Sequence, residues 1–146
     1  MNFKKQMLIV DDSQSLREAL RMVFEDEFEV KFASDIDEAI KIIENDFQHI
    51  VLLDYRIQRM RGINKMKKLC QSIPATRVIV LSTSNDKFTA DKARQCGAFE
   101  FVGKPFDISQ IKTTVSNAYI GIEYKNGKKI SNNKKKPEKV TSGSTV

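Results

Sequence analysis

The chain has 146 residues, of which 40% are hydrophobic and 30% are charged, and its formal net charge is +6. This length suits one domain, or one domain with a tail, and allows a core that needs no disulfide. Cys70 and Cys96 lie in helix-like sequence, so we expect reduced thiols packed against the core rather than a disulfide or a metal site. No apolar run reaches the length of a signal peptide or a transmembrane helix, which predicts a cytoplasmic protein without a membrane partner.

The positive charge is concentrated at the C-terminal end. Residues 123–146 hold seven lysines and two glutamates and therefore account for +5 of the net charge of +6. The rest of the chain is nearly neutral, so its charge does not indicate a nucleic-acid-binding surface. The apolar pattern also ends near residue 122, and we expect a folded domain over 1–122 followed by a basic, disordered tail over 123–146.

The first half of the chain alternates between strand-like and helix-like patterns. An apolar run at 7–10 predicts a strand, and apolar residues spaced as on one helix face follow at 16, 19, 20, 23 and 24. Residues 28–32 alternate apolar and charged side chains, which is typical of an edge strand with one exposed face. Ser34 with Asp37 resembles a helix start, and a second apolar helix face follows at 36, 39, 40, 43 and 47.

The second half continues the alternation. Residues 50–54 form a short apolar run that ends in a carboxylate, which is typical of a strand buried in a parallel sheet. A polar loop over 55–62 precedes a helix with apolar residues at 63, 66, 69, 70 and 73, and Pro74 stops it. Strands at 77–81 and 99–102 flank a weakly apolar helix for which Gly97 is the expected C-terminal cap. Asp107 with Gln110 opens the last helix, which has apolar residues at 108, 111, 115, 118 and 122.

Five strand–helix units in succession predict parallel strands joined by right-handed crossovers. We therefore expect an α/β fold of the flavodoxin-like, doubly wound (βα)5 kind: a three-layer sandwich with a central five-stranded parallel sheet. The C-terminal ends of its strands would meet at one edge, where ligands bind in this architecture. The polar residues that this edge would collect are Asp11, Asp12, Asp54, Ser82, Thr83 and Lys104.

These side chains suit phosphoryl chemistry. Three carboxylates in one pocket would repel each other, and a ligand set of oxygens alone favours Mg²⁺. A lysine and a hydroxyl would complete a site for a phosphoryl group, whose oxygens they can contact. A carboxylate can itself form an aspartyl phosphate, and Asp54, at the end of a buried strand, is the first candidate.

The same residues resemble those of a known family. The acidic pair, the acid that ends the third strand, the hydroxyls and the Lys-Pro-Phe turn are similar to the receiver domain of two-component response regulators. The resemblance is to single-domain members like the chemotaxis regulators and covers about residues 6–120. Five elements in the right order are much more specific than any of them alone; they are Asp11, Asp12, Asp54, Ser82-Thr83 and Lys104-Pro105-Phe106.

The resemblance implies a role for each matched residue at the site. Asp54 would accept the phosphoryl group, and Lys104 would contact that group. Mg²⁺ would be bound by Asp11, Asp12, Asp54 and the backbone carbonyl of Arg56.

The resemblance also implies a conformational switch. Ser82 falls at the switch hydroxyl position, Phe101 falls at the switch aromatic position, and the peptide bond from Lys104 to Pro105 would be cis. Phosphorylation would draw the hydroxyl and then the aromatic ring inward, and so change the surface of the fourth helix, fifth strand and fifth helix. The weak apolar pattern of the fourth helix suits such a movement, because little buried area opposes it. This surface would bind a downstream protein or, when phosphorylated, a second copy.

The implied function is a signalling switch that receives its phosphoryl group from a histidine kinase or a phosphotransfer protein. It would catalyse only its own phosphorylation and dephosphorylation, and so would not be an enzyme in the usual sense. The alternatives are a receiver fragment of a longer regulator, a regulator that acts through an output partner or its basic tail, and a Mg²⁺-dependent phosphohydrolase. Arg56 disfavours the hydrolase, because such sites usually carry an acid at that position. The tail lacks aromatic residues beyond Tyr124, so direct nucleic-acid binding is not expected. His49 is interpreted as a surface or satisfied histidine rather than a catalytic base.

Overall fold

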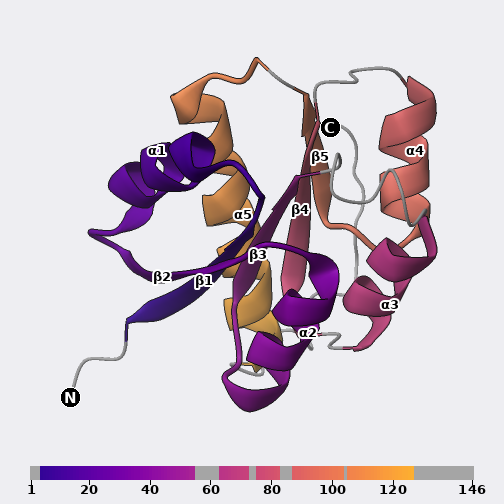
Figure 1. The fold of residues 1–146 in the computed structure, drawn as a ribbon, viewed down its shortest axis with the longest axis horizontal. Coiled ribbons are helices and arrows are strands. Elements are labelled where there is room, and N and C mark those ends of the chain that lie inside the picture. Colours follow the sequence, from indigo (N-terminus) through magenta and orange to yellow (C-terminus); the bar gives the residue numbers. More distant parts are fainter. Residues whose placement is uncertain (1–3, 55–62, 73–74, 83–86, 104, 127–146) are drawn as a thin grey trace.

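The computed structural model describes residues 4–54, 63–72, 75–82, 87–103 and 105–126. Five strands and five helices alternate along these residues (Figure 1). The strands are β1 (Lys5–Val10), β2 (Phe28–Ala33), β3 (Ile50–Asp54), β4 (Arg77–Ser82) and β5 (Glu100–Gly103). The helices are α1 (Gln14–Phe24), α2 (Ile36–Asn45), α3 (Ile63–Ser72), α4 (Lys87–Gln95) and α5 (Ile108–Asn126).

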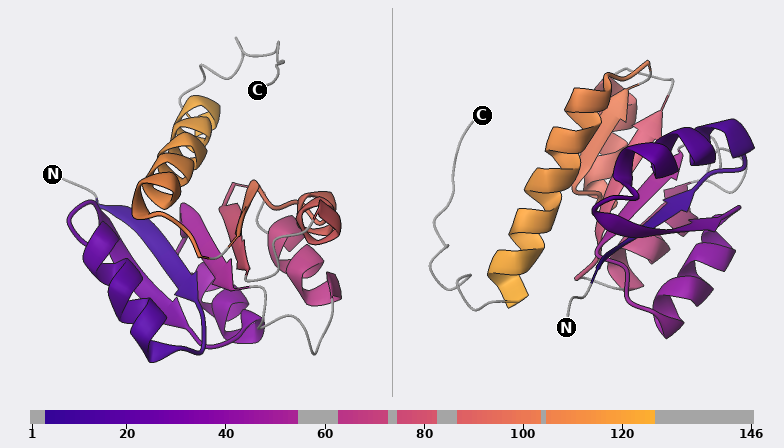
Figure 2. Two further views of the ribbon diagram at one scale, coloured as in Figure 1. Left: turned by 90° about the horizontal axis from the view of Figure 1, so that it is seen from above. Right: turned by 90° about the vertical axis from the view of Figure 1, so that its left-hand side faces the viewer.

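The five strands form one parallel sheet in the order β2-β1-β3-β4-β5. Helices α1 and α5 cover one face of the sheet, and α2, α3 and α4 cover the other (Figures 1 and 2). Side chains of the three central strands alternate between two cores, as a pleated strand requires. In β3, Ile50 and Leu52 join the core under α1 and α5, whereas Val51 and Leu53 join the core under α2, α3 and α4.

The expected fold is confirmed. The third strand spans the predicted residues, and all five of them are buried. The alternating strand β2 lies at one edge of the sheet, as its pattern predicts. Gly97 has a φ of 108° after α4, a conformation that suits glycine and ends the helix.

Four details of the predicted helices are wrong. Asp35, rather than Ser34, caps α2 by accepting a hydrogen bond from the Glu38 backbone N–H at 2.8 Å. That helix ends at Asn45, so Phe47 lies beyond it and is 37% exposed. Helix α5 continues to Asn126, past the expected end of the helical pattern, and Ile108 at its start is exposed rather than inward. The division into a domain and a tail stays a prediction, because residues 127–146 lie outside the described part.

The two cysteines lie beside each other in the core under α2, α3 and α4. Both are free thiols, and a Cβ atom added to Gly97, which follows Cys96, would lie 3.0 Å from Cys70 Cβ. Burial, followed by the neighbouring Cys96 thiol, raises the pKa of the Cys70 thiol to about 12. Because the thiolate is the reactive form, this raised pKa disfavours nucleophilic reaction of Cys70 at neutral pH.

His49 has a structural role between β1 and α5. Its Nδ1 atom accepts a hydrogen bond from the Gln6 backbone N–H at 3.0 Å, and its ring lies 5.2 Å from that of Tyr119 between centroids. The histidine is therefore satisfied, as its sequence context indicates. Burial, and then the positive charge of Lys5, hold the pKa of His49 below its usual value of 6.5.

We expect the protein to lose stability when the pH falls below about 6.5, the ordinary histidine pKa. With a lowered folded pKa, the unfolded chain binds more protons in this range, so acidification favours unfolding. Protonation would also remove the acceptor for the Gln6 N–H. Urea unfolding between pH 5 and pH 8, compared with a His49→Gln variant, measures this contribution. A difference between the two proteins that does not change with pH would contradict it.

Candidate metal and phosphoryl site

Three aspartates meet at the C-terminal edge of the sheet. Asp11 and Asp12 follow β1, Asp54 ends β3, and each offers a carboxylate oxygen within 4.8 Å of those of the other two. Asp11 and Asp54 are each only 1% exposed, whereas Asp12 faces solvent. The structure therefore brings together the three predicted carboxylates, although Asp54 lies 43 positions after Asp11 in the sequence.

Local hydrogen bonds shape the turn that carries Asp11 and Asp12. The Asp11 N–H donates to the Ala33 carbonyl at 3.1 Å, which continues the pairing of β1 with β2 by one residue. One Asp11 carboxylate oxygen, Oδ1, accepts the Ser13 N–H at 2.6 Å. Ser13 then caps α1, and its Oγ accepts the Leu16 N–H at 3.3 Å. The chain leaves the sheet through this turn and presents both acids at the edge.

Asp54 and Ser82 are placed by neighbouring strands. Asp54 pairs with Leu81 in the register of β3 and β4, so Ser82 lies one residue further toward the edge. Ser82 ends β4, is 1% exposed and pairs with Gly103. Adjacent strands lie about 4.8 Å apart, so the Ser82 backbone borders the aspartate cluster. Phe101 is half-buried and packs against the core under α4, in the strand next to Ser82.

Some predicted site residues lie outside the described residues. Neither the Arg56 carbonyl, nor Thr83, nor Lys104 is described, and the geometry of the bond from Lys104 to Pro105 is therefore not described either. Their roles stay predictions. Pro105 itself is exposed after β5.

The carboxylate cluster fits a small divalent cation by its donor chemistry. All three side chains offer hard oxygen ligands, and Mg²⁺ binds such ligands at 2.0–2.1 Å. Two ligands on opposite sides of Mg²⁺ are thus about 4.2 Å apart, and the three carboxylate oxygens lie within 4.8 Å of one another. An ion would also offset the mutual repulsion of the three acids. Among the described residues, this is the site that could hold a metal.

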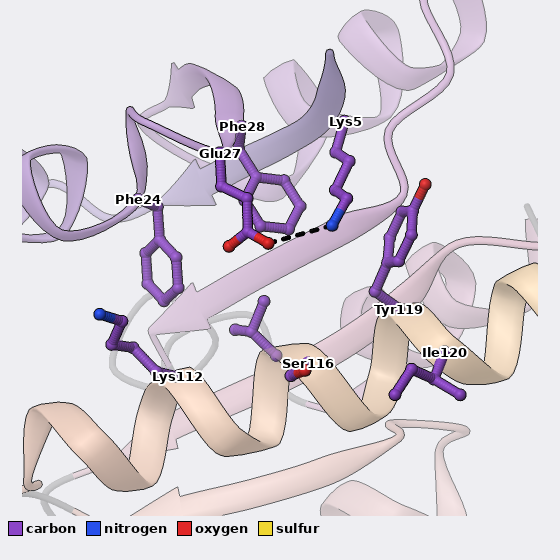
Figure 3. A pocket seen from close by; sticks show the side chains of 9 residues that line it. Lys5, Phe24, Glu27, Phe28, Lys112, Ser116, Tyr119 and Ile120 are labelled. Atoms are coloured by element: carbon purple, nitrogen blue, oxygen red, sulfur yellow. Dashed lines mark hydrogen bonds and ion pairs between the residues drawn. The ribbon is translucent and has the colours of Figure 1, made fainter. Parts of the chain in front are cut away.

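A separate hollow of about 180 Å³ lies between α5 and the turn after α1. Phe24, Phe28 and Tyr119 line it, with Lys5 and Glu27 paired at 3.0 Å on one side (Figure 3). Lys5 begins β1 and Asp11 follows its end, so about 20 Å of strand separates this hollow from the aspartates. It is not part of the acidic site.

Sequence reasoning missed Arg17, a half-buried residue of α1 that reaches the site. Its Nε atom donates to the Asp11 backbone carbonyl and one terminal nitrogen donates to Ser34 Oγ, both at 2.8 Å. An arginine on an amphipathic helix usually faces solvent, so its residue type alone carries no such signal. Its position one turn after the Ser13 cap is the only feature that could have indicated it.

Comparison with known sequences identifies the family of this arrangement. Residues 7–116 match the family model described as the response regulator receiver domain. The regulatory protein AtoC of Escherichia coli is 32% identical over 114 residues, which are 77% of this chain but 25% of AtoC. Sporulation initiation phosphotransferase F of Bacillus subtilis is 30% identical over 112 residues, which are 76% of this chain and 90% of that protein. The chain thus spans about a quarter of AtoC but most of the sporulation protein.

Solved structures agree with the fold. A response regulator from Thermotoga maritima superposes with a TM-score of 0.74 at 24% identity, covering 81% of this chain and 99% of that one. NtrX from Brucella abortus gives a TM-score of 0.75 at 25% identity, covering 86% of this chain and 28% of NtrX. Among the described residues, no helix combines the length and the hydropathy needed to cross a bilayer.

Proposed function

We infer that this chain, which belongs to the response regulator receiver domain family, is a signalling switch activated by phosphorylation of Asp54. The observation that carries this inference is the meeting of Asp11, Asp12 and Asp54 within 4.8 Å at the C-terminal edge of the sheet. Asp54 is the acceptor of choice because it ends the central strand β3 and lies beside Ser82. It is also shielded from water, which would protect an acyl phosphate from hydrolysis.

The proposed phosphoryl transfer uses the acidic cluster together with two predicted site residues. An Asp54 carboxylate oxygen forms a bond to phosphorus while the bond from phosphorus to the donor breaks, and the electron pair of that bond leaves with the donor. Asp11, Asp12 and Asp54, with the Arg56 carbonyl, would bind Mg²⁺, which would neutralise charge on the transferring oxygens. The ammonium of Lys104 would contact the same oxygens.

The switch would reach the surface through α4 and β5. Ser82 lies in β4 beside the phosphoryl position, and Phe101 in β5 packs against the core under α4. Helix α4 has nine residues and buries only Ala93 among those of its side chains that are described. A movement of Ser82 toward the phosphoryl group would leave space that Phe101 can fill, at little cost to the packing of α4.

The proposed role as a phosphorylated receiver domain implies two kinds of protein partner. A histidine kinase or phosphotransfer protein would donate the phosphoryl group, with imidazole as the leaving group, and a downstream protein would bind the face of α4, β5 and α5. The chain would act by changing this binding rather than by turning over a substrate. AtoC and NtrX extend far beyond the region that this chain matches, so an output domain elsewhere in a longer regulator is a further form of the same proposal.

Amide NMR shifts on addition of Mg²⁺ and beryllofluoride, a phosphoryl mimic, test the switch. We expect shifts at the acidic turn and also at Ser82, in α4 and at Phe101. An Asp54→Asn variant should show none of the remote shifts. Shifts confined to the turns that carry Asp11, Asp12 and Asp54 would show that the site binds the mimic without switching, and would contradict the proposed function.

A further inference from the structure

We propose that Arg17 is a positioning residue that sets the affinity of the acidic site for Mg²⁺ by fixing the Asp11–Asp12 turn. The proposal rests on the proposed function, because it concerns the same carboxylates. Arg17 itself would not bind the ion. Its guanidinium donates hydrogen bonds to the Asp11 backbone carbonyl and to Ser34 Oγ, just before α2.

Asp11 is anchored from three directions. Its N–H donates to Ala33 in β2, its Oδ1 accepts the N–H of Ser13, and its carbonyl accepts Nε of Arg17. The bond to Ala33 extends the β1–β2 pairing, and the bond from Ser13 lies within the turn itself. The bond from the Arg17 side chain holds the carbonyl of the peptide that joins Asp11 to Asp12, and the orientation of that peptide helps to direct the two adjacent carboxylates.

Arg17 is itself held in place. Its guanidinium carbon lies 5.6 Å from the centre of the Phe32 ring, and its second donor is bound by Ser34. The Ser34 N–H donates at 2.8 Å to Glu38, whose own N–H bonds to the Asp35 cap of α2. The Arg17 guanidinium thus connects the acidic turn after β1 to the segment that precedes α2. Hydrogen bonds hold both of its acceptors, the Asp11 carbonyl and Ser34 Oγ, in place.

A guanidinium suits this connection better than an ammonium does. Its donors lie in a rigid plane, so one nitrogen can bond to the Asp11 carbonyl while another bonds to Ser34 and the guanidinium carbon lies over the Phe32 ring. A lysine would keep the positive charge but could not hold both acceptors and the ring contact. The Arg17→Lys substitution therefore separates the bonds from the charge.

A role for Arg17 through its charge and a role through its hydrogen bonds predict opposite changes in the affinity for Mg²⁺. If Arg17 acted only through its charge, it would repel the cation, so Arg17→Ala would bind Mg²⁺ more tightly and Arg17→Lys would bind it unchanged. If it acts by positioning, both variants should bind more weakly. Loss of a group that orients a metal ligand typically lowers metal affinity by about 10- to 100-fold.

The experiment is a Mg²⁺ titration followed by amide NMR shifts, for wild type, Arg17→Lys, Arg17→Ala and Ser34→Ala. We expect about a tenfold rise in Kd for Arg17→Lys and for Arg17→Ala, and a smaller rise for Ser34→Ala, which removes one anchor without changing charge. The matched control is Arg21→Lys, one turn along α1, where the guanidinium pairs only with the exposed Glu18 and Glu25 among the described residues. Its Kd should equal that of wild type.

A structural readout distinguishes positioning from general damage. The NMR signal of the Ser13 amide, whose nitrogen lies 2.6 Å from its acceptor Asp11 Oδ1, should shift in the metal-free Arg17 variants, whereas the amide signals of β3 and β4 should not. Urea unfolding without Mg²⁺ checks that each variant is folded. Unchanged Kd values, tighter binding by Arg17→Ala, or equal loss in Arg21→Lys would each overturn the proposal. If wild type itself binds no Mg²⁺, the proposed function fails instead.

Discussion

An Asp54→Asn variant is expected to gain no phosphoryl group from acetyl phosphate and Mg²⁺, under conditions in which the wild type gains one. An amide has nearly the same shape as the carboxylate, so packing around this 1% exposed side chain should survive. The amide offers no carboxylate oxygen as nucleophile, however, and the change removes one charge from the metal site. Intact mass spectrometry with and without Mg²⁺ measures the outcome directly, and the expected effect is complete loss.

The control for this loss is Asp107→Asn. Asp107 is an exposed acid before α5 that accepts hydrogen bonds from Ser109 at 3.0 and 3.1 Å, outside the cluster of three aspartates. Its labelling should match that of wild type, and labelling of wild type should disappear when EDTA removes Mg²⁺. A phosphoryl group that persists on Asp54→Asn would remove Asp54 from the acceptor role.

Phe28→Ala is expected to lower the free energy of unfolding by about 3–5 kcal/mol. Phe28 is 2% exposed and packs edge-on against Phe24 and Tyr119, with ring centroids 5.9 and 6.3 Å away. Alanine would leave a cavity where β2, α1 and α5 meet, beside the hollow already present there (Figure 3). Urea unfolding at pH 7 measures the change.

Two further variants serve as controls for the effect of Phe28→Ala on stability. Met22→Ala, on the exposed face of α1, should change stability by no more than about 0.5 kcal/mol, because the side chain is 69% exposed. Phe28→Leu fills most of the cavity and should lower the free energy of unfolding by less than Phe28→Ala does. Because a domain has only about 5–15 kcal/mol of stability, the alanine variant could fail to fold, and the leucine variant then still measures the effect. Equal losses for Phe28→Ala and Met22→Ala would contradict the assigned core.

The sheet could be predicted because its strands carry distinct patterns. A strand buried on both faces needs an apolar side chain at every position, so β3 was recognisable as a continuous apolar run from Ile50 to Leu53. The edge strand β2 has one wet face, so it alternates instead. Its position beside β1 then follows from the usual adjacency of consecutive strands.

Helix ends were less predictable, because capping and burial there depend on neighbours that are distant in sequence. Phe47 matched the apolar spacing of α2, but the chain leaves the helix at Asp46 and the ring packs edge-on against His49. Ile108 matched the spacing of α5, but the first turn of that helix extends beyond the core and leaves its side chain 44% exposed. The spacing of apolar residues indicates which face of a helix can be buried, but it does not show whether the core extends to the end of that helix.

The acidic cluster was predictable because topology alone brings strand ends together. Asp11, Asp12 and Asp54 had only to follow parallel strands of one sheet to meet. Arg17 was not predictable, because its role depends on a backbone carbonyl and on Ser34 from another loop. Residues that act through the backbone leave no pattern of residue types for sequence reasoning to detect.

The measurement that tests the central claim most directly is chemical mapping of the phosphoryl group. Borohydride reduces an aspartyl phosphate to homoserine and leaves free carboxylates unchanged, so peptide mass spectrometry after treatment with acetyl phosphate, Mg²⁺ and borohydride identifies the acceptor. We expect homoserine at position 54 and unreduced aspartate at positions 11 and 12. Homoserine at position 11 or 12, or a phosphoryl group that resists borohydride and maps to Ser82, would contradict the account.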